Sequence, residues 1–354
     1  MTPEQFRAEH PDFFFLEAEA LGPITRYLES CRLLEPDERV LQAGRAGDGN
    51  MNCVVRVQTD QRSRILKQSR PWVEKYPHIP APADRILAEA RFFELAAGDA
   101  DVAAALPHLD HLDRDNRLAV FEDLGESPSL MGLYDREPLG SDEAHALGVW
   151  LARVHRIDLG GKTFPNREMR QLNHEHIFAF PFRANNGQDL DALTPGLAQA
   201  ASEIQGEVAL VAAIQQLGED VYLSDEGACL LHGDYFPGSW MRSKERLCVI
   251  DPEFGFVGRP EFDVGVALAH LHLARQAPSV RNGFMEGYRT LPHSIDMDLA
   301  LQLAGVEILR RLIGVAQLPL EADAPQKRVW MAQAREAVLN PTEARGSVLV
   351  HGEA

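Results

Sequence analysis

The sequence predicts an α+β chain of two domains, a small β-rich domain over residues 1–124 and a larger, mostly helical domain over residues 125–354. At 354 residues the chain exceeds the usual size of a single hydrophobic core. Between residues 40 and 124, short β-branched and apolar runs bounded by turn residues indicate strands, with one helix among them. After Gly125, long runs with helical spacing dominate, which places the boundary there.

The composition is that of a soluble globular protein, with 45% hydrophobic and 25% charged residues. The net charge of −18, without a block of Lys or Arg, argues against nucleic acid or an anionic membrane as a partner. No stretch approaches the roughly 18 apolar residues of a membrane span, and the first residues lack the pattern of a secretory signal. We therefore expect a cytoplasmic protein.

The cysteines and histidines give little indication of a metal or redox centre. The four cysteines are scattered without a C-x-x-C pair, so buried free thiols are expected instead of a zinc knuckle or a redox dithiol. Two His-x-His runs occur, at 174/176 and at 270/272. The second run has a helical pattern, in which side chains at i and i+2 point to different sides, so we expect neither run to hold a metal.

A lysine in the first domain is predicted to form a buried ion pair. "NMNCVVRVQTD" and "SRILKQS" read as the two strands of a hairpin, and "APADRILAEARFFELAA" as an amphipathic helix. Strand alternation puts Lys67 on the same face as Ile65, and a lysine on an inward face needs a carboxylate partner. Glu89, in the middle of the helix, is the predicted partner, with Glu94 as the alternative.

Two apolar runs in the second domain end in acidic side chains. "ACLLHGD" ends at Asp234, and "LCVIDPEF" carries Asp251 and Glu253 at its end, so each predicts a buried strand that delivers carboxylates. The two strands are expected to lie side by side as a hairpin-like pair. Such a cluster of like charges favours a bound cation, and magnesium prefers these hard oxygen ligands. Alternatively, "HGD" is a plain turn and "DPE" is a type I turn.

Phosphoryl transfer requires further parts, and the sequence offers them in kinase order. "AGRAGDGNMNCVVRV" supplies a glycine-containing loop around Gly47 and Gly49, although alone it is typical of an ordinary hairpin turn. Lys67 follows on the next strand. "LAVFEDLGE" then gives an apolar strand that leads into a polar connection, as expected of a hinge whose backbone holds an adenine edge.

These motifs resemble the aminoglycoside phosphotransferase and choline kinase superfamily, and within it the 5-methylthioribose kinase family. "GDGNMN" is similar to that family's glycine loop, "LKQS" to its lysine strand, "HGDYFPGS" to its catalytic loop, "DPEFGFVGRPEFDVG" to its metal segment, and "LRRLIGVAQ" to its paired arginines. The resemblance runs from about residue 44 to residue 317. It implies a protein-kinase-like fold of two lobes, with ATP and Mg²⁺ as cofactors.

The resemblance also implies residue roles. Asp234 would orient the acceptor hydroxyl and receive its proton, and Asp263 would brace the catalytic loop from a buried helix. The implied metal residues are Asp251, Glu253 and Ser239. The implied nucleotide residues are Gly47, Gly49, Asn50, Lys67, Glu89 and the hinge residues Glu122, Asp123 and Leu124. The implied substrate residues are Arg310, Arg311 and Tyr235. The two arginines could equally form salt bridges to the many acids of the chain.

The function implied is ATP-dependent transfer of the γ-phosphoryl group to a sugar hydroxyl, with 5-methylthioribose as the first candidate acceptor. Tyr235 and Phe236 depart from the family pattern, so another small alcohol or an aminoglycoside stays an alternative acceptor. A non-catalytic pseudokinase and a metal-dependent phosphohydrolase are the competing classes. The resemblance suggests a homodimer.

Overall fold

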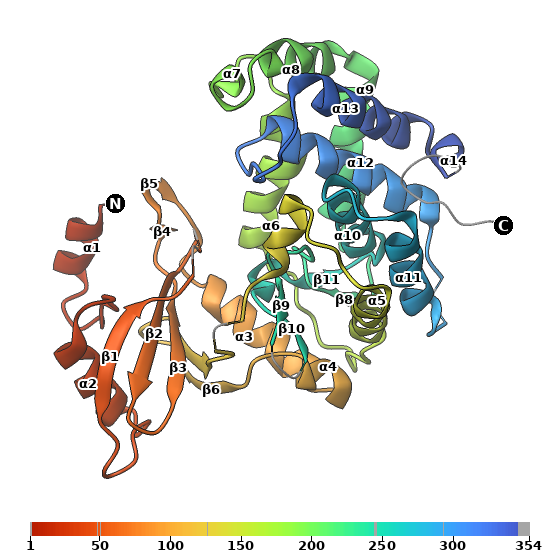
Figure 1. Cartoon of the computed structure of the whole chain (residues 1–354). Helices are drawn as coiled ribbons and strands as arrows, with labels where there is room; N and C mark the ends of the chain where they lie inside the picture. Colours follow the sequence, from red (N-terminus) through yellow and green to blue (C-terminus); the bar gives the residue numbers. More distant parts are fainter. Residues whose placement is uncertain are drawn as a thin grey trace. The chain divides into compact units, whose positions relative to one another are not determined.

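The computed structural model describes residues 2–47, 49, 51–125, 127–243, 246–292 and 294–345. Contacts divide the chain into unit 1, residues 1–94 and 106–127, and unit 2, residues 95–105 and 128–354. Unit 1 is built on a small antiparallel sheet and unit 2 is mainly helical, which confirms the predicted fold class (Figure 1). The segment 95–105 packs with unit 2, where the Trp150 Nε1–H donates to the carbonyl oxygen of Val102 (3.2 Å).

The sheet of unit 1 has five antiparallel strands in the order β1-β2-β3-β7-β6. These strands are β1 (Val40–Arg45), β2 (Cys53–Thr59), β3 (Ser63–Gln68), β6 (Leu109–Asp113) and β7 (Leu118–Glu122). Unit 1 also contains α1 (Pro3–Glu9), α2 (Leu21–Ser30), most of α3 (Arg85–Ala96) and the small hairpin β4 (Trp72–Val73) and β5 (Tyr76–Pro80). The predicted strand–strand–helix succession is therefore confirmed.

The two faces of this sheet carry different hydrophobic clusters because successive side chains of a strand point to opposite sides. On one face, Leu66 and Val120 pack with Ile24 of α2. On the other face, Phe121 packs with Ile86 of α3. Both faces are thus covered by helices, as Figure 1 shows for α2 and α3.

Unit 2 holds two short antiparallel strand pairs, one nested inside the other in the sequence. β8 (Cys229–Leu231) pairs with β11 (Phe256–Gly258), and β9 (Trp240–Arg242) pairs with β10 (Leu247–Val249). The prediction that the strand before Asp234 pairs with the strand before Asp251 was wrong. The strand before Asp234, β8, pairs with β11, and the strand before Asp251, β10, pairs with β9. Nesting nevertheless brings the two loops, 232–239 and 250–255, to the same end of the pairs.

The helices of unit 2 surround α10 (Glu261–Leu273), all of whose residues are buried. A helix that is apolar around most of its circumference is expected at the centre of a helical domain. The runs with helical spacing expected after Gly125 include α5 (Ser141–His155) and α12 (Met297–Ile313). Glu143 accepts from the N–H of Gly140, so Gly140 is the N-cap of α5 and Ser141 its first residue.

The remaining helical segments of unit 2 are α4 (Ala100–Ala104), η1 (Leu130–Asp135), α6 (Arg167–His174), η2 (Glu175–Ala179), η3 (Phe180–Phe182), α7 (Leu190–Leu193), α8 (Leu197–Gly206), α9 (Val208–Gln216), η4 (Leu217–Tyr222), η5 (Pro252–Phe254), α11 (Pro278–Arg289), α13 (Ala324–Leu339) and α14 (Pro341–Ala344). Within the described ranges, none of the helices combines the length and the hydropathy needed to cross a bilayer.

Candidate active site

The loop after β8 presents Asp234, and its shape depends on Gly233. The backbone of Gly233 has φ +81°, and a Cβ atom there would lie 2.1 Å from the carbonyl oxygen of Phe254. Only glycine adopts this conformation without strain and allows so close an approach. The loop that carries Asp234 and the segment that carries Asp251 and Glu253 are therefore packed directly against each other.

Asp263 of α10 binds the backbone of this loop through hydrogen bonds. Its carboxylate accepts from the backbone N–H groups of His232 (2.6 Å) and Gly233 (2.9 Å), and its side chain has no exposed surface. A buried carboxylate that accepts two backbone hydrogen bonds fixes the loop strongly, because charged hydrogen bonds are the stronger kind. The predicted bracing role of Asp263 is confirmed.

His232 and Ser239 connect the two loops to each other. Nε2 of His232 lies 3.0 Å from the carbonyl oxygen of Ile250, and its Nδ1 accepts from the N–H of Asp234 (3.3 Å). Nδ1 is thus the acceptor, so Nε2 carries the proton and donates it to Ile250. The hydroxyl of Ser239, which is 2% exposed, donates to the carbonyl oxygen of Asp234 (2.9 Å). This contact makes Ser239 a support of the loop that carries Asp234.

The segment after β10 places two carboxylates in different surroundings. Asp251 is exposed, with φ +61° and ψ +48°, whereas Glu253 lies in the short helix η5 and is 6% exposed. A left-handed backbone at a residue other than glycine is uncommon and concentrates at functional positions. Nδ2 of Asn166 donates to the carbonyl oxygens of Glu253 (2.9 Å) and Gly255 (2.8 Å), which holds the segment in place.

The paired arginines of α12 lie beside Asp234. NH2 of Arg310 is 3.6 Å and NH2 of Arg311 is 3.4 Å from Oδ1 of Asp234. Their Nε atoms donate to Glu307, at 2.6 Å and 2.7 Å respectively. Both arginines are nearly buried, at 5% and 6% exposed. Of the two predicted roles of the arginines, substrate contact and salt bridges, the structure shows the salt bridges. One of the salt-bridge partners is Asp234, the predicted catalytic residue.

The charges in this cluster shift one another's ionisation. Burial opposes the charge on Glu307, but Arg310 and Arg311 outweigh it and hold the pKa of Glu307 well below its usual range. Burial raises the pKa of Asp234, and Arg311 and Arg310 oppose that rise. Asp251 and Glu307 also raise the pKa of Asp234, so the carboxylates of the two loops interact electrostatically.

His270 completes the network under Glu307. Its Nε2 lies 2.9 Å from Oε1 of Glu307, and its Nδ1 lies 2.5 Å from the hydroxyl of Tyr134. Burial lowers the pKa of His270 to about 4, so the ring is neutral near pH 7. The ionised Glu307 can only accept, so Nε2–H donates to it and Nδ1 accepts from Tyr134.

The two aromatic residues after Asp234 lie in contrasting places. Tyr235 is fully buried, stacks on Trp150 with ring centroids 5.4 Å apart, and donates its hydroxyl to the carbonyl oxygen of Leu147 (2.9 Å). The ring of Tyr235 therefore belongs to the core, and its contact with substrate stays a prediction. Phe236 is half-buried, and the guanidinium of Arg311 lies 4.8 Å from its ring centre.

In unit 1, the predicted ion pair is present. Nζ of Lys67 lies 2.7 Å from Oε2 of Glu89, and the two side chains are 6% and 3% exposed. Lys67 is opposite Ala119 of β7 in the sheet register, on the face that α3 covers. Glu94, the alternative partner, instead forms an ion pair with Arg91 (2.8 Å).

The glycine loop joins β1 and β2. Gly47 has φ +68°, with no heavy atom within 4 Å of a Cβ atom placed there, and a Cβ on Gly49 would only touch Val54, at 4.0 Å. Both positions therefore leave the loop backbone open to a ligand. Asn50 lies outside the described residues.

The predicted hinge residues are Glu122, which ends β7, and Asp123 and Leu124, which follow it. The carboxylate of Asp123 forms an ion pair with Arg56 (2.8 Å) and accepts from Ser63 (2.5 Å). Oε2 of Glu122 accepts from the N–H of His108 (3.0 Å). Because both side chains are engaged within unit 1, the backbone of this segment is the part suited to hold an adenine edge.

Sequence reasoning missed Glu307 and His270 as parts of the site. The signal for Glu307 was its spacing of three and four residues from Arg310 and Arg311, which puts all three on one helix face. His270 and His272 take separate partners, Glu307 and Gln333. Over the described ranges, the one group of three metal-type ligands within mutual reach is Cys31, His111 and Asp113 of unit 1, and it includes neither His-x-His run.

Comparison with known proteins agrees with this arrangement. Residues 43–297 match the sequence profile of the phosphotransferase enzyme family. The chain belongs to this family. A methylthioribose kinase of Exiguobacterium sibiricum is 30% identical over 64% of this chain, and the match spans 60% of that relative. A methylthioribose kinase of Citrobacter koseri is 26% identical over 80% of this chain and 83% of the relative.

Among solved structures, choline kinase LicA from Streptococcus pneumoniae matches with a TM-score of 0.52 at 16% identity, over 89% of this chain and 97% of LicA. A structure of LicA in complex with AMP matches with a TM-score of 0.51, also at 16% identity, over 92% of this chain and 99% of that chain. At this identity the likeness shows the fold, and the kinase-like fold expected from the sequence is confirmed.

Proposed function

We propose that this protein is an ATP-dependent small-molecule kinase that transfers the γ-phosphoryl group to a sugar hydroxyl, with 5-methylthioribose as the first acceptor to test. The observation that carries the proposal is the catalytic loop, whose Asp234 is supported by Asp263 from below and flanked by Arg310 and Arg311. The acceptor is drawn from the relatives named methylthioribose kinase, at 26–30% identity.

In this proposal Asp234 accepts a hydrogen bond from the acceptor hydroxyl, aims its oxygen, and receives its proton during transfer. Little covalent chemistry is asked of the protein, because phosphoryl transfer depends on positioning and charge neutralisation. Arg311 and Arg310 favour the ionised form of Asp234. They also keep a positive potential beside it, suited to anionic oxygens.

Asp251 and Glu253 are the proposed metal ligands. Two carboxylates supply hard oxygens, and the exposed Asp251 sits at a strand end in a strained backbone conformation, so the donor set fits magnesium. Magnesium, when bound, would neutralise charge on the nucleotide phosphates. Ser239, whose hydroxyl is engaged with Asp234, is proposed to keep the loop in shape.

Unit 1 is proposed to bind ATP. Lys67, held by Glu89, would neutralise nucleotide phosphates, the open backbone at Gly47 and Gly49 would cover them with Asn50, and the backbone of residues 122–124 would hold the adenine. The buried ion pair fixes the lysine head in one place, which a mobile surface lysine could not do.

The experiment is coupled ADP release with Mg·ATP and a panel of 5-methylthioribose, ribose, choline and an aminoglycoside, with the phosphorylated product identified by mass spectrometry. Turnover with one acceptor, reduced by about 10²–10⁴-fold in Asp234→Asn, is expected. The exposed Asp220→Asn serves as the matched control and should keep full activity. Phosphate release without an acceptor would show a phosphohydrolase, and ATP binding without turnover would show a pseudokinase.

A further inference from the structure

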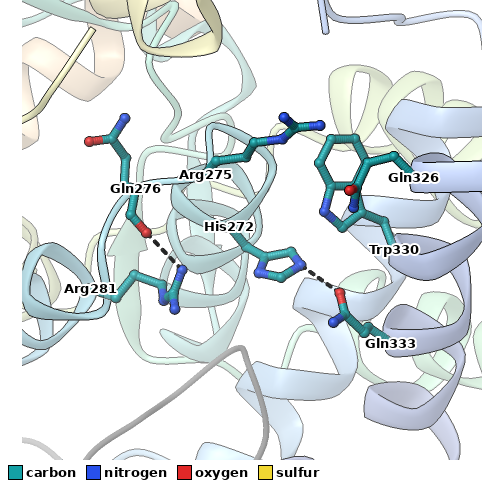
Figure 2. Close-up of a pocket in the computed structure, with 7 residues that line it drawn as sticks. All are labelled: His272, Arg275, Gln276, Arg281, Gln326, Trp330 and Gln333. Carbon is teal, nitrogen blue, oxygen red and sulfur yellow. Dashed lines mark hydrogen bonds between the residues drawn. The ribbon is translucent and has the colours of Figure 1, made fainter. Parts of the chain in front are cut away.

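A cavity of about 350 Å³ lies in unit 2 among α10, α11 and α13, and Figure 2 shows the residues that line it. His272 comes from the end of α10, Arg281 from α11, and Gln326, Trp330 and Gln333 from α13. None of these residues takes part in the proposed kinase site. The volume is within the range of small-molecule sites and exceeds the space that one inorganic ion fills.

The charge of this pocket is opposite to that of the whole chain. The protein carries 53 acidic and 35 basic residues, yet the described residues that line the pocket include two arginines, Arg275 and Arg281, and no Asp or Glu. A pocket without carboxylates in so acidic a chain is suited to an anion.

Arg281 is the decisive residue. It is 5% exposed, and one of its NH groups donates to the carbonyl oxygen of Gln276 (3.0 Å). Within the part of the chain that the structure describes, no carboxylate pairs with it and its Nε has no hydrogen-bond partner. A buried guanidinium stays charged, and such a charge is costly unless an anion balances it.

The other lining groups suit a ligand with a charged end and an organic body. Arg275 has a left-handed backbone with φ +53°, and its exposed side chain reaches over Trp330, with the guanidinium carbon 5.2 Å from the ring centre. Trp330 supplies a flat apolar wall. Nε2 of His272 lies 3.0 Å from Oε1 of Gln333, as drawn in Figure 2; this contact orients the amide of Gln333 within the pocket.

We propose that this pocket binds a small phosphate monoester, with its phosphate group against Arg281 and Arg275 and its organic part against Trp330. Hydrogen-bond donors come from α11, from α13 and from the turn that follows α10. A tetrahedral phosphate accepts hydrogen bonds from several directions, unlike a planar carboxylate. The site is independent of Asp234 and of the acceptor that the kinase uses.

The test is isothermal titration calorimetry of the full chain with ribose 5-phosphate, inorganic phosphate, ribose and citrate. Ribose 5-phosphate is expected to bind more tightly than inorganic phosphate, and ribose is expected not to bind. Arg275→Ala and the isosteric Gln326→Glu should each weaken binding by about tenfold, because each removes or opposes a charge contact. Arg289→Ala, on the exposed side of α11, is the matched control and should bind like the wild type.

A second variant separates ligand binding from folding. Arg281→Met removes the unbalanced buried charge, so it is expected to raise the melting temperature of the free protein while abolishing the binding of ribose 5-phosphate. A purely structural arginine would give the opposite change in melting temperature. The proposal is overturned if ribose 5-phosphate does not bind the wild type, if citrate alone binds, or if Arg275→Ala and Gln326→Glu bind as tightly as Arg289→Ala.

Discussion

Asp263→Asn tests whether the shape of the catalytic loop depends on one buried carboxylate. The substitution keeps the size of the side chain but replaces one carboxylate oxygen by an NH₂ group. Since Asp263 accepts from two backbone N–H groups, at 2.6 Å and 2.9 Å, one of these donors would then face another donor. A buried donor left without an acceptor costs about 1–3 kcal/mol, and the remaining hydrogen bond loses its charge, so we expect a loss of about 3 kcal/mol.

The measurement is thermal unfolding followed by circular dichroism, together with kcat on the acceptor found in the panel. A loss of about 3 kcal/mol corresponds to about 6–12 °C in Tm for a domain of 150–250 residues. The exposed Asp220→Asn should change stability by no more than about 0.5 kcal/mol. A Tm of Asp263→Asn equal to that of the control would refute the idea that this carboxylate holds the loop.

Three further substitutions test other parts of the molecule. Glu89→Gln removes the carboxylate charge 2.7 Å from the buried Lys67 and should cost about 3–5 kcal/mol in chemical denaturation, much of which Lys67→Met in the same chain should restore; no recovery would speak against the pair. Gly233→Ala should lower stability by more than about 2 kcal/mol, because its Cβ would meet the carbonyl of Phe254 and its φ is positive, whereas Gly206→Ala, where the space is open, should not. Arg311→Met removes the largest influence that lowers the pKa of Asp234, so this pKa should rise further. As the pH is lowered, kcat/KM of the variant should therefore begin to fall at a higher pH than kcat/KM of the wild type. An unchanged pH profile would contradict this coupling.

The ion pair of unit 1 could be predicted from the sequence because two simple rules act together. Strand alternation placed Lys67 on an inward face, and a buried charge requires a partner within reach. The middle of the following helix was the nearest source of a carboxylate, and Glu89 fills that place. The identity of the partner followed from geometry within about 25 residues of chain.

The strand pairing and the inner part of the site could not be predicted in the same way. Strands of three residues, such as β8 and β10, carry too little pattern to specify a partner, and the close approach of Gly233 to Phe254 that accompanies the observed pairing joins residues distant in the sequence. The burial of Glu307 depends on how α12 packs against α10, which no local pattern records.

The nested strand pairs also bear on how the site assembles as the chain folds. The contact between Gly233 and Asp263 closes a loop of 30 residues, whereas the contact between Asp234 and Arg311 spans 77. Closing the longer loop costs about 0.8 kcal/mol more in chain entropy, so the loops 232–239 and 250–255 can form together before α12 docks. Transient detachment of α12 in the native state would then move Arg310 and Arg311 away from Asp234 and leave the loop that carries Asp234 intact. The charge around the Asp234 carboxylate would therefore change without a change in the position of Asp234.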